Sequence, residues 1–265
     1  MTLNQLLDNM WEDYCQFNPA AEKIHQALVK RGEKVVNDHI ALRTLNHPRL
    51  GIKSLAKQFE TFGYKAMQDY HFTEKKLYAW HYEHEKDPTY PKIFISELEL
   101  EKMSPFVQET MNKLAEQVTE SDLKRPDFAM RGRPWNVSHE TYLKLADESE
   151  YASWVAAYGF RPNHFTVNVN SLKTFETLPA VNDFIKSLGF KMNTSGGEIK
   201  GTPEQLLEQS STMAEQGQVK FKDGTFPVPA CYYEFALRYK KPDGKLYQGF
   251  VAASADKIFE STNRM

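Results

Sequence analysis

The sequence predicts an α+β protein in which two βαβββ modules form one cupped, half-barrel sheet with added helices. Three landmarks occur twice and in the same order: a strand with a histidine, a helix that ends at glycine, and a later strand with a glutamate. Several landmarks repeated in one order indicate a duplicated module. We expect the modules at about residues 36–102 and 160–240, within a single domain that spans residues 1–265.

The segment before the first module, residues 1–34, is predicted to be helical. Apolar residues recur every three or four positions from Leu3 to Tyr14, which is the pattern of an amphipathic helix. The pattern breaks at Asn18 and Pro19, resumes, and stops at Gly32.

The first module is predicted to begin with a strand near residues 35–44. Polar or small residues alternate with aliphatic ones there, which places His39 and Arg43 on one face of a sheet. A helix from about 52 to 61 follows, and Gly63 closes it. Further strands are predicted near residues 64–67, 77–82 and 92–100.

Residues 103–158 are predicted to form a helical connector, because their apolar content is too high for a disordered linker. The second module then repeats the first, with His164 in a strand near 161–169 and a helix that ends at Gly189. Strands are predicted at 219–221 and 231–238. The last of these is matched with the strand at 92–100, which sets Glu234 opposite Glu97.

The module histidines His39 and His164, together with Glu234, are predicted to lie on the inner wall of the cup. Two imidazoles and one carboxylate form a facial triad, which holds a metal ion and leaves three coordination positions open. This donor set suits Fe(II), with Zn(II), Mn(II), Co(II) or Ni(II) as substitutes. A histidine on a strand is more often a hydrogen-bonded core residue, but its occurrence at the same place in both modules favours the metal site.

Two arginines have alternative interpretations. Arg43 lies four residues after His39 on the same face, so its guanidinium either binds a substrate carboxylate or is an exposed strand-end group. Arg238 lies four residues after Glu234 and either binds a second carboxylate or pairs with an acidic residue on the surface. Glu97 is a fourth ligand, a partner of a ligand, or a remnant of the duplication.

The other histidines are predicted to lie outside the site. His81 and His84 stand in the charged stretch WHYEHEKD, which is typical of a solvated strand end. A nucleophilic role for Cys231 is disfavoured, because a small thiol within a strand is usually a buried core residue.

The composition excludes several classes of partner. The 265 residues are 41% hydrophobic and carry a net charge of −2 with no basic face, which argues against nucleic-acid binding. No apolar run approaches the length of a membrane span, and the acidic N-terminus lacks the features of a signal peptide. With two cysteines, we expect a cytoplasmic protein without disulfide bonds.

Three stretches of the sequence carry a family resemblance. Asp38–Thr44, Asn163–Thr166 and Tyr233–Arg238 resemble the 2-oxoadipate dioxygenase/decarboxylase family, also called hydroxyglutarate synthases. That family has a fold similar to the vicinal-oxygen-chelate superfamily. The resemblance implies that the triad binds Fe(II) and that Arg43 binds a substrate carboxylate. It also implies that 2-oxoadipate, or a similar 2-oxo acid, reacts with O2 to give D-2-hydroxyglutarate and CO2 in lysine catabolism.

Two other functions stay open at this point. One is a metal-dependent hydrolase, lyase or isomerase of the same fold, with Zn(II), Mn(II) or Ni(II) as a Lewis acid. The other is a non-catalytic binding protein whose cup holds a small ligand. Uptake of O2 distinguishes the first from an oxygenase, and metal content distinguishes the second. The expected partners are a small 2-oxo acid and O2, with no nucleic acid or membrane.

Overall fold

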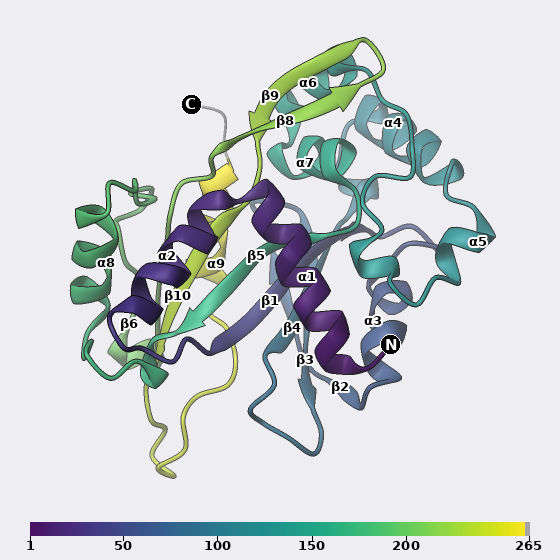
Figure 1. Cartoon of the computed structure of the whole chain (residues 1–265). Coiled ribbons are helices and arrows are strands. Elements are labelled where there is room, and N and C mark those ends of the chain that lie inside the picture. The colour runs from purple at the N-terminus through teal and green to yellow at the C-terminus, as the bar shows by residue number, and fades with distance from the viewer. Residues whose placement is uncertain (263–265) are drawn as a thin grey trace.

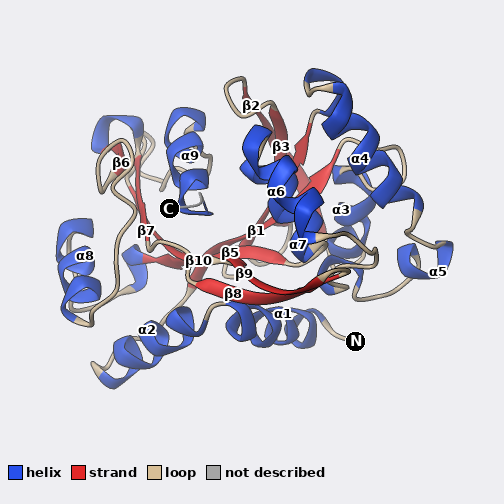
Figure 2. Ribbon diagram, turned by 90° about the horizontal axis from the view of Figure 1, so that it is seen from above, coloured by secondary structure: helices blue, strands red, loops and turns tan. Residues whose placement is uncertain are grey.

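The structure, a computed structural model, describes residues 1–262 and is built around one curled, mixed sheet (Figure 1). The sheet contains β1 (Asn37–Leu45), β2 (Tyr64–Phe72), β3 (Leu77–His84), β4 (Lys92–Leu98), β5 (Pro162–Asn168), β6 (Lys200–Thr202), β7 (Leu207–Ser211) and β10 (Tyr232–Arg238). Their spatial order is β2-β3-β4-β1-β5-β10-β7-β6. Seen from above, the sheet bends so that β2 and β3 form one arm of a cup and β6 and β7 the other (Figure 2). The predicted half-barrel is therefore confirmed.

The duplication is visible in the topology. Helix α3 (Ile52–Glu60) lies between β1 and β2, and α8 (Leu178–Ser187) lies between β5 and β6. In each half the first strand pairs in parallel with the last, and the halves join through the antiparallel pair of β1 and β5. The two helix-ending glycines, Gly63 and Gly189, both adopt positive φ angles, of 94° and 90°. Both modules are therefore βαβββ units with the same helix ending.

The strand predicted at residues 219–221 is present, but its place in the second module was wrong. Residues 219–221 belong to β8 (Gln216–Phe221), which pairs with β9 (Gly224–Pro229) in a separate hairpin. The strands that complete the module are β6 and β7, which the sequence did not predict. β6 has three residues, and β7 buries Gln209, Ser210 and Ser211, so neither shows alternating hydrophobicity. Buried polar strands of this kind carry no period-2 signal.

The register also corrects the match between the two glutamates. In each module the strand histidine lies beside the first residue of the last strand, Lys92 or Tyr232. Counting two residues on from these positions gives Phe94 in the first module and Glu234 in the second, so Phe94 is the equivalent of Glu234. The prediction that Glu97 corresponds to Glu234 is therefore wrong.

Helices cover both faces of the sheet. The helices outside the modules are α1 (Leu3–Phe17), α2 (Pro19–Lys30), α4 (Pro105–Glu116), α5 (Glu120–Leu123), α6 (His139–Glu148), α7 (Glu150–Tyr158) and α9 (Ala252–Phe259). Helices α1 and α2 lie within residues 1–34, and α4 to α7 lie within residues 103–158. Helices α1 and α2 lie on the convex side of the sheet, whereas α9 lies inside the cup between its two arms (Figure 2). No helix within residues 1–262 is long and apolar enough to cross a membrane.

Candidate metal centre

Three neighbouring strands bring His39, His164 and Glu234 together. His39 on β1 and Glu234 on β10 are the register partners of Thr166, one on each side of β5. His164 lies two residues before Thr166, so its side chain points to the same face of the sheet. All three candidate ligand side chains are buried on the inner face of the cup.

The ligand atoms converge on one point. His39 Nε2 lies 3.4 Å from Glu234 Oε1, and His164 Nε2 lies 3.2 Å from Oε2 of the same carboxylate. One candidate ligand atom from each of the three residues lies within 4.8 Å of the others. Within residues 1–262, no other set of three histidine, cysteine, aspartate or glutamate side chains brings its possible ligand atoms this close together. The predicted triad is therefore assembled by the fold.

Hydrogen bonds orient both imidazoles. His39 Nδ1 lies 2.8 Å from Asp38 Oδ1, and His164 Nδ1 lies 3.1 Å from Asn163 Oδ1. A carboxylate or amide oxygen accepts the Nδ1 proton, so each Nε2 carries the lone pair that a metal ion would bind. In His39 that atom now lies 3.1 Å from the Thr166 hydroxyl. Metal-binding histidines usually have such a partner on their second nitrogen.

Two β-bulges place these orienting side chains. On β1, Asp38 is the extra residue between the pairs made by Asn37 and His39. On β5, Asn163 is skipped between the pairs made by Pro162 and His164. Bulges next to active sites re-aim a side chain, and here each turns the residue before a histidine toward its ring. The sequence analysis missed both residues, although the repeated pattern of Asp or Asn before histidine was available.

Arg238 supports the centre from behind. Its Nε and Nη2 donate to the two oxygens of Asp38, at 2.6 and 2.8 Å, and both side chains are about 2% exposed. Arg238 pairs with an acidic residue, as one of its two predicted roles required, but the pair is buried and does not lie on the surface. The prediction overlooked the bulge that turns Asp38 inward.

The electrostatics of the site fit a divalent cation. Burial raises the pKa of Glu234, and it lowers the pKa of His164 well below its ordinary value, with help from the charges of His39 and Arg43. Gln209 Nε2 also donates to Glu234 Oε1, at 2.7 Å, and holds the carboxylate in place. Neutral imidazoles and an ionised carboxylate are the forms that a metal ion binds, so a cation offsets the burial of that negative charge.

Arg43 lies further along β1 and is engaged by other parts of the chain. Its Nη1 donates to Glu150 Oε1 of α7 at 2.7 Å, and its Nη2 donates to Thr262 Oγ1 at 3.2 Å. The guanidinium is buried, with the rings of Tyr151 and Trp154 at 4.9 and 5.1 Å. Its Nε has no hydrogen-bond partner within the described residues. The alternative of an exposed strand-end arginine is therefore wrong.

The metal centre is closed in this conformation. The cavity at the triad has a volume of only about 20 Å³, whereas organic ligands occupy pockets of roughly 300 Å³ or more. Phe250 covers one side, with its ring edge-on to that of His39 at 4.8 Å. Ile258 and Phe259 of α9 also line the space. In this conformation the space beside the triad is therefore too small for an organic ligand.

Three further residues test the sequence predictions. Glu97 is not a fourth ligand, because its Oε2 accepts a hydrogen bond from the backbone of Ile52 at the start of α3, at 2.8 Å. His81 is not solvated, as its ring is buried and bonds to the Tyr70 hydroxyl at 2.8 Å. Cys231 is buried as predicted, and burial raises the pKa of its thiol to about 12.

Fold and site together define a class of protein. A curled mixed sheet with two histidines and one glutamate on its inner face is the arrangement of a half-barrel metal enzyme. The sequence model of the family described as 2-oxoadipate dioxygenase/decarboxylase matches residues 2–244. The chain therefore belongs to the 2-oxoadipate dioxygenase/decarboxylase family, as the resemblance implied.

Individual relatives agree with this assignment. The chain is 34% identical to the chloroplastic/amyloplastic 2-oxoadipate dioxygenase/decarboxylase of Oryza sativa, over 97% of this chain and 78% of the relative. The crystal structure of an Oryza sativa hydroxyglutarate synthase in complex with 2-oxoadipate matches with a TM-score of 0.90 and 33% identity, covering 98% of this chain and 91% of that one. A Shewanella frigidimarina crystal structure, described as that of a putative hydrolase, matches in fold with a TM-score of 0.90 and 50% identity, covering 94% of this chain and 98% of that one.

Proposed function

We propose that this chain is an Fe(II)-dependent dioxygenase/decarboxylase that converts 2-oxoadipate, or a similar 2-oxo acid, to D-2-hydroxyglutarate. One molecule of 2-oxoadipate and one of O2 give one of 2-hydroxyglutarate and one of CO2, so all atoms balance. The observation that carries the proposal is the buried triad of His39, His164 and Glu234 in a member of this family. The family relation selects the oxygenase reaction from the chemistries that such a triad supports.

The residues of the chain have distinct roles in this proposal. His39, His164 and Glu234 would hold the iron, which supplies the redox chemistry by which O2 oxidises the 2-oxo acid. The Asp38 and Asn163 side chains hold the two imidazoles in the orientation that binding requires.

Substrate binding would use the guanidinium of Arg43, which in this structure is paired with Glu150. The guanidinium of Arg43 can bind a carboxylate through two parallel hydrogen bonds, and the carboxylate of Glu150 now occupies one of its nitrogens. A substrate carboxylate would replace Glu150 there. Phe250 and α9 would then exclude water from the reacting groups once they close over them.

The test is O2 consumption by protein reconstituted with Fe(II) under anaerobic conditions. Addition of 2-oxoadipate should cause O2 uptake, with one 2-hydroxyglutarate formed per O2, measured by an oxygen electrode and mass spectrometry. The variant His164→Ala should lose both signals, whereas His71→Ala, which removes an exposed histidine, should keep them.

Two outcomes contradict the proposal in different ways. One bound metal per chain without O2 uptake on 2-oxoadipate or other 2-oxo acids would favour a hydrolase, lyase or isomerase that uses the same triad. Absence of metal binding would favour a non-catalytic ligand-binding protein.

A further inference from the structure

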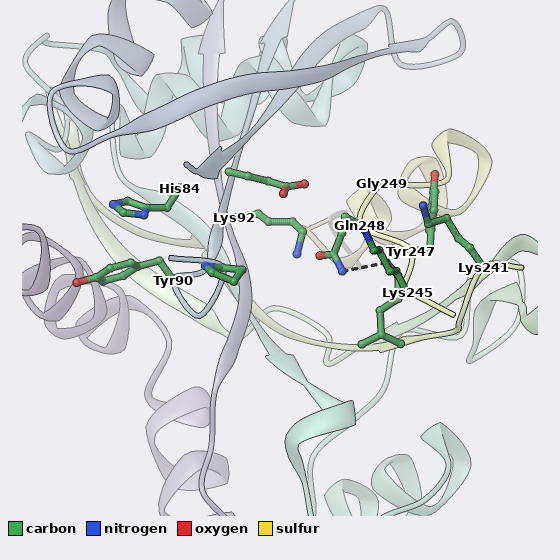
Figure 3. A pocket seen from close by; sticks show the side chains of 11 residues that line it. His84, Tyr90, Lys92, Lys241, Lys245, Tyr247, Gln248 and Gly249 are labelled. Carbon is green, nitrogen blue, oxygen red and sulfur yellow. Dashed lines mark hydrogen bonds between the residues drawn. The ribbon is translucent and has the colours of Figure 1, made fainter. Parts of the chain in front are cut away.

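A second and larger cavity lies next to the metal centre. Its volume is about 470 Å³, which is within the range of small-molecule sites. The end of β3, the start of β4 and the loop of residues 239–249 form its walls. In Figure 3 the Lys92 side chain extends from β4 toward the loop that carries Tyr247 and Gln248. None of the three triad residues lines this cavity.

The cavity is rich in positive charge. Three lysines line it, Lys92 from β4 and both Lys241 and Lys245 from the loop. Lys241 pairs with Asp243 at 2.9 Å, but within residues 1–262 Lys92 and Lys245 have no carboxylate in ion-pair distance. The carboxylate of Glu83 also lines the cavity, and it is bonded to His81 at 3.1 Å. Two ammonium groups on different segments are therefore available to an anion.

Lys92 reaches the cavity from the strand beside His39. It is the register neighbour of His39, so its side chain lies on the inner face of the cup. Burial lowers the pKa of its ammonium group, while the charges of Asp38 and Glu83 oppose that effect and the charge of Arg238 adds to it. A bound carboxylate would stabilise the charged form of the ammonium group further.

The wall of the cavity is tied to the metal centre. Arg238, which pairs with Asp38, also donates to the backbone oxygens of Tyr247 and Gly249, at 3.1 and 2.7 Å. The next residue after Gly249 is Phe250, which covers His39. A ligand in the cavity would therefore contact the same loop that leads into the closing segment.

We propose that this cavity is a docking site for a small dicarboxylic acid, which binds here before Phe250 moves and admits it to the metal centre. Lysines on two walls match a molecule with a carboxylate at each end, and an ammonium group binds a carboxylate without a fixed geometry. The identity of this acid as the substrate rests on the proposed function. The binding site itself does not, because it is built from residues outside the triad.

The test uses glutarate, a dicarboxylic acid without the 2-oxo group, and isothermal titration calorimetry. Metal-free and metal-loaded protein should each bind one glutarate per chain. Lys92→Gln and Lys245→Gln should each weaken binding about tenfold, the loss expected for one charge-assisted contact. Lys124→Gln, which neutralises an exposed lysine on the connector, and His164→Ala should bind as the unchanged protein does. Lys245 is exposed, so its variant tests the site even if Lys92→Gln fails to fold.

Kinetics provide the second measurement. Lys245→Gln should lower kcat/KM for the 2-oxo acid about tenfold at low salt and leave kcat unchanged, and added salt should reduce the difference. If Lys92→Gln and Lys245→Gln bind glutarate as tightly as the Lys124→Gln control and the unchanged protein, the proposal is overturned. Loss of glutarate binding in His164→Ala, or equally tight binding of the monocarboxylate butyrate, would also overturn it. Absence of O2 uptake would contradict the proposed function and leave the glutarate result unaffected.

Discussion

Replacement of Arg238 by methionine should strongly destabilise the protein, because it removes one member of a buried ion pair. Arg238 donates to both oxygens of Asp38 and to two backbone oxygens of the 239–249 loop. Methionine has a similar length and no donor. Burial disfavours the ionised form of Asp38, but the charge and hydrogen bonds of Arg238, together with the hydrogen bond to His39, hold the pKa of this carboxyl well below its usual value.

The expected loss follows from leaving that carboxylate buried without its partner. Removal of one member of a buried pair costs about 3–5 kcal/mol of stability. Metal affinity should also fall by about 10- to 100-fold, because Asp38 holds Nδ1 of His39. Urea unfolding followed by circular dichroism measures the first effect, and titration of the metal-free protein with Zn(II) or Mn(II) measures the second.

A double variant makes the test specific. In Asp38→Asn with Arg238→Met, neither charge is left unpaired, so the combined loss of stability should be smaller than the sum of the two single losses. A loss below about 1 kcal/mol for Arg238→Met, or fully additive losses, would refute the view that the pair supports the metal centre.

Three further predictions concern the metal, the substrate and pH. His164→Ala should bind no metal while His71→Ala binds one ion per chain, as measured by elemental analysis of the dialysed proteins. Arg43→Ala should raise KM for the 2-oxo acid more than it lowers kcat in steady-state assays, because it removes a carboxylate contact. Burial lowers the pKa of Lys200 to about 8, whereas the unfolded chain keeps that proton to about pH 10.4. The unfolded state then holds more protons between these values, so stability should rise with pH across this window by up to roughly 3 kcal/mol. Urea unfolding should show that Lys200→Met loses this rise, and an unchanged slope in that variant would contradict the assignment.

The parts of the site that local patterns encode were predictable from the sequence. The alternation around His39 and its repetition around His164 placed both rings on one face of a duplicated sheet. Glu234 was reached through a strand rich in aromatic and aliphatic residues, although the match of that residue with Glu97 was wrong. These inferences need only strand periodicity and the repeat.

The parts that long-range packing decides were not predictable. Asp38 and Arg238 are 200 residues apart in the chain, and a bulge brings them together. His81 is in a stretch of charged residues, yet it is buried against Tyr70 and Phe250. The sequence pattern of residues 252–259 does not show that the helix they form packs inside the cup.

The order of these parts along the chain has a consequence for biosynthesis. All three candidate ligands precede Phe250 and α9, the segment that lines and covers the space beside them. Chains fold from the N-terminus as they are made, so the two modules can form their shared sheet before the closing segment is synthesised. The triad is then open to the surrounding solution, and a metal ion can enter before the cup is filled.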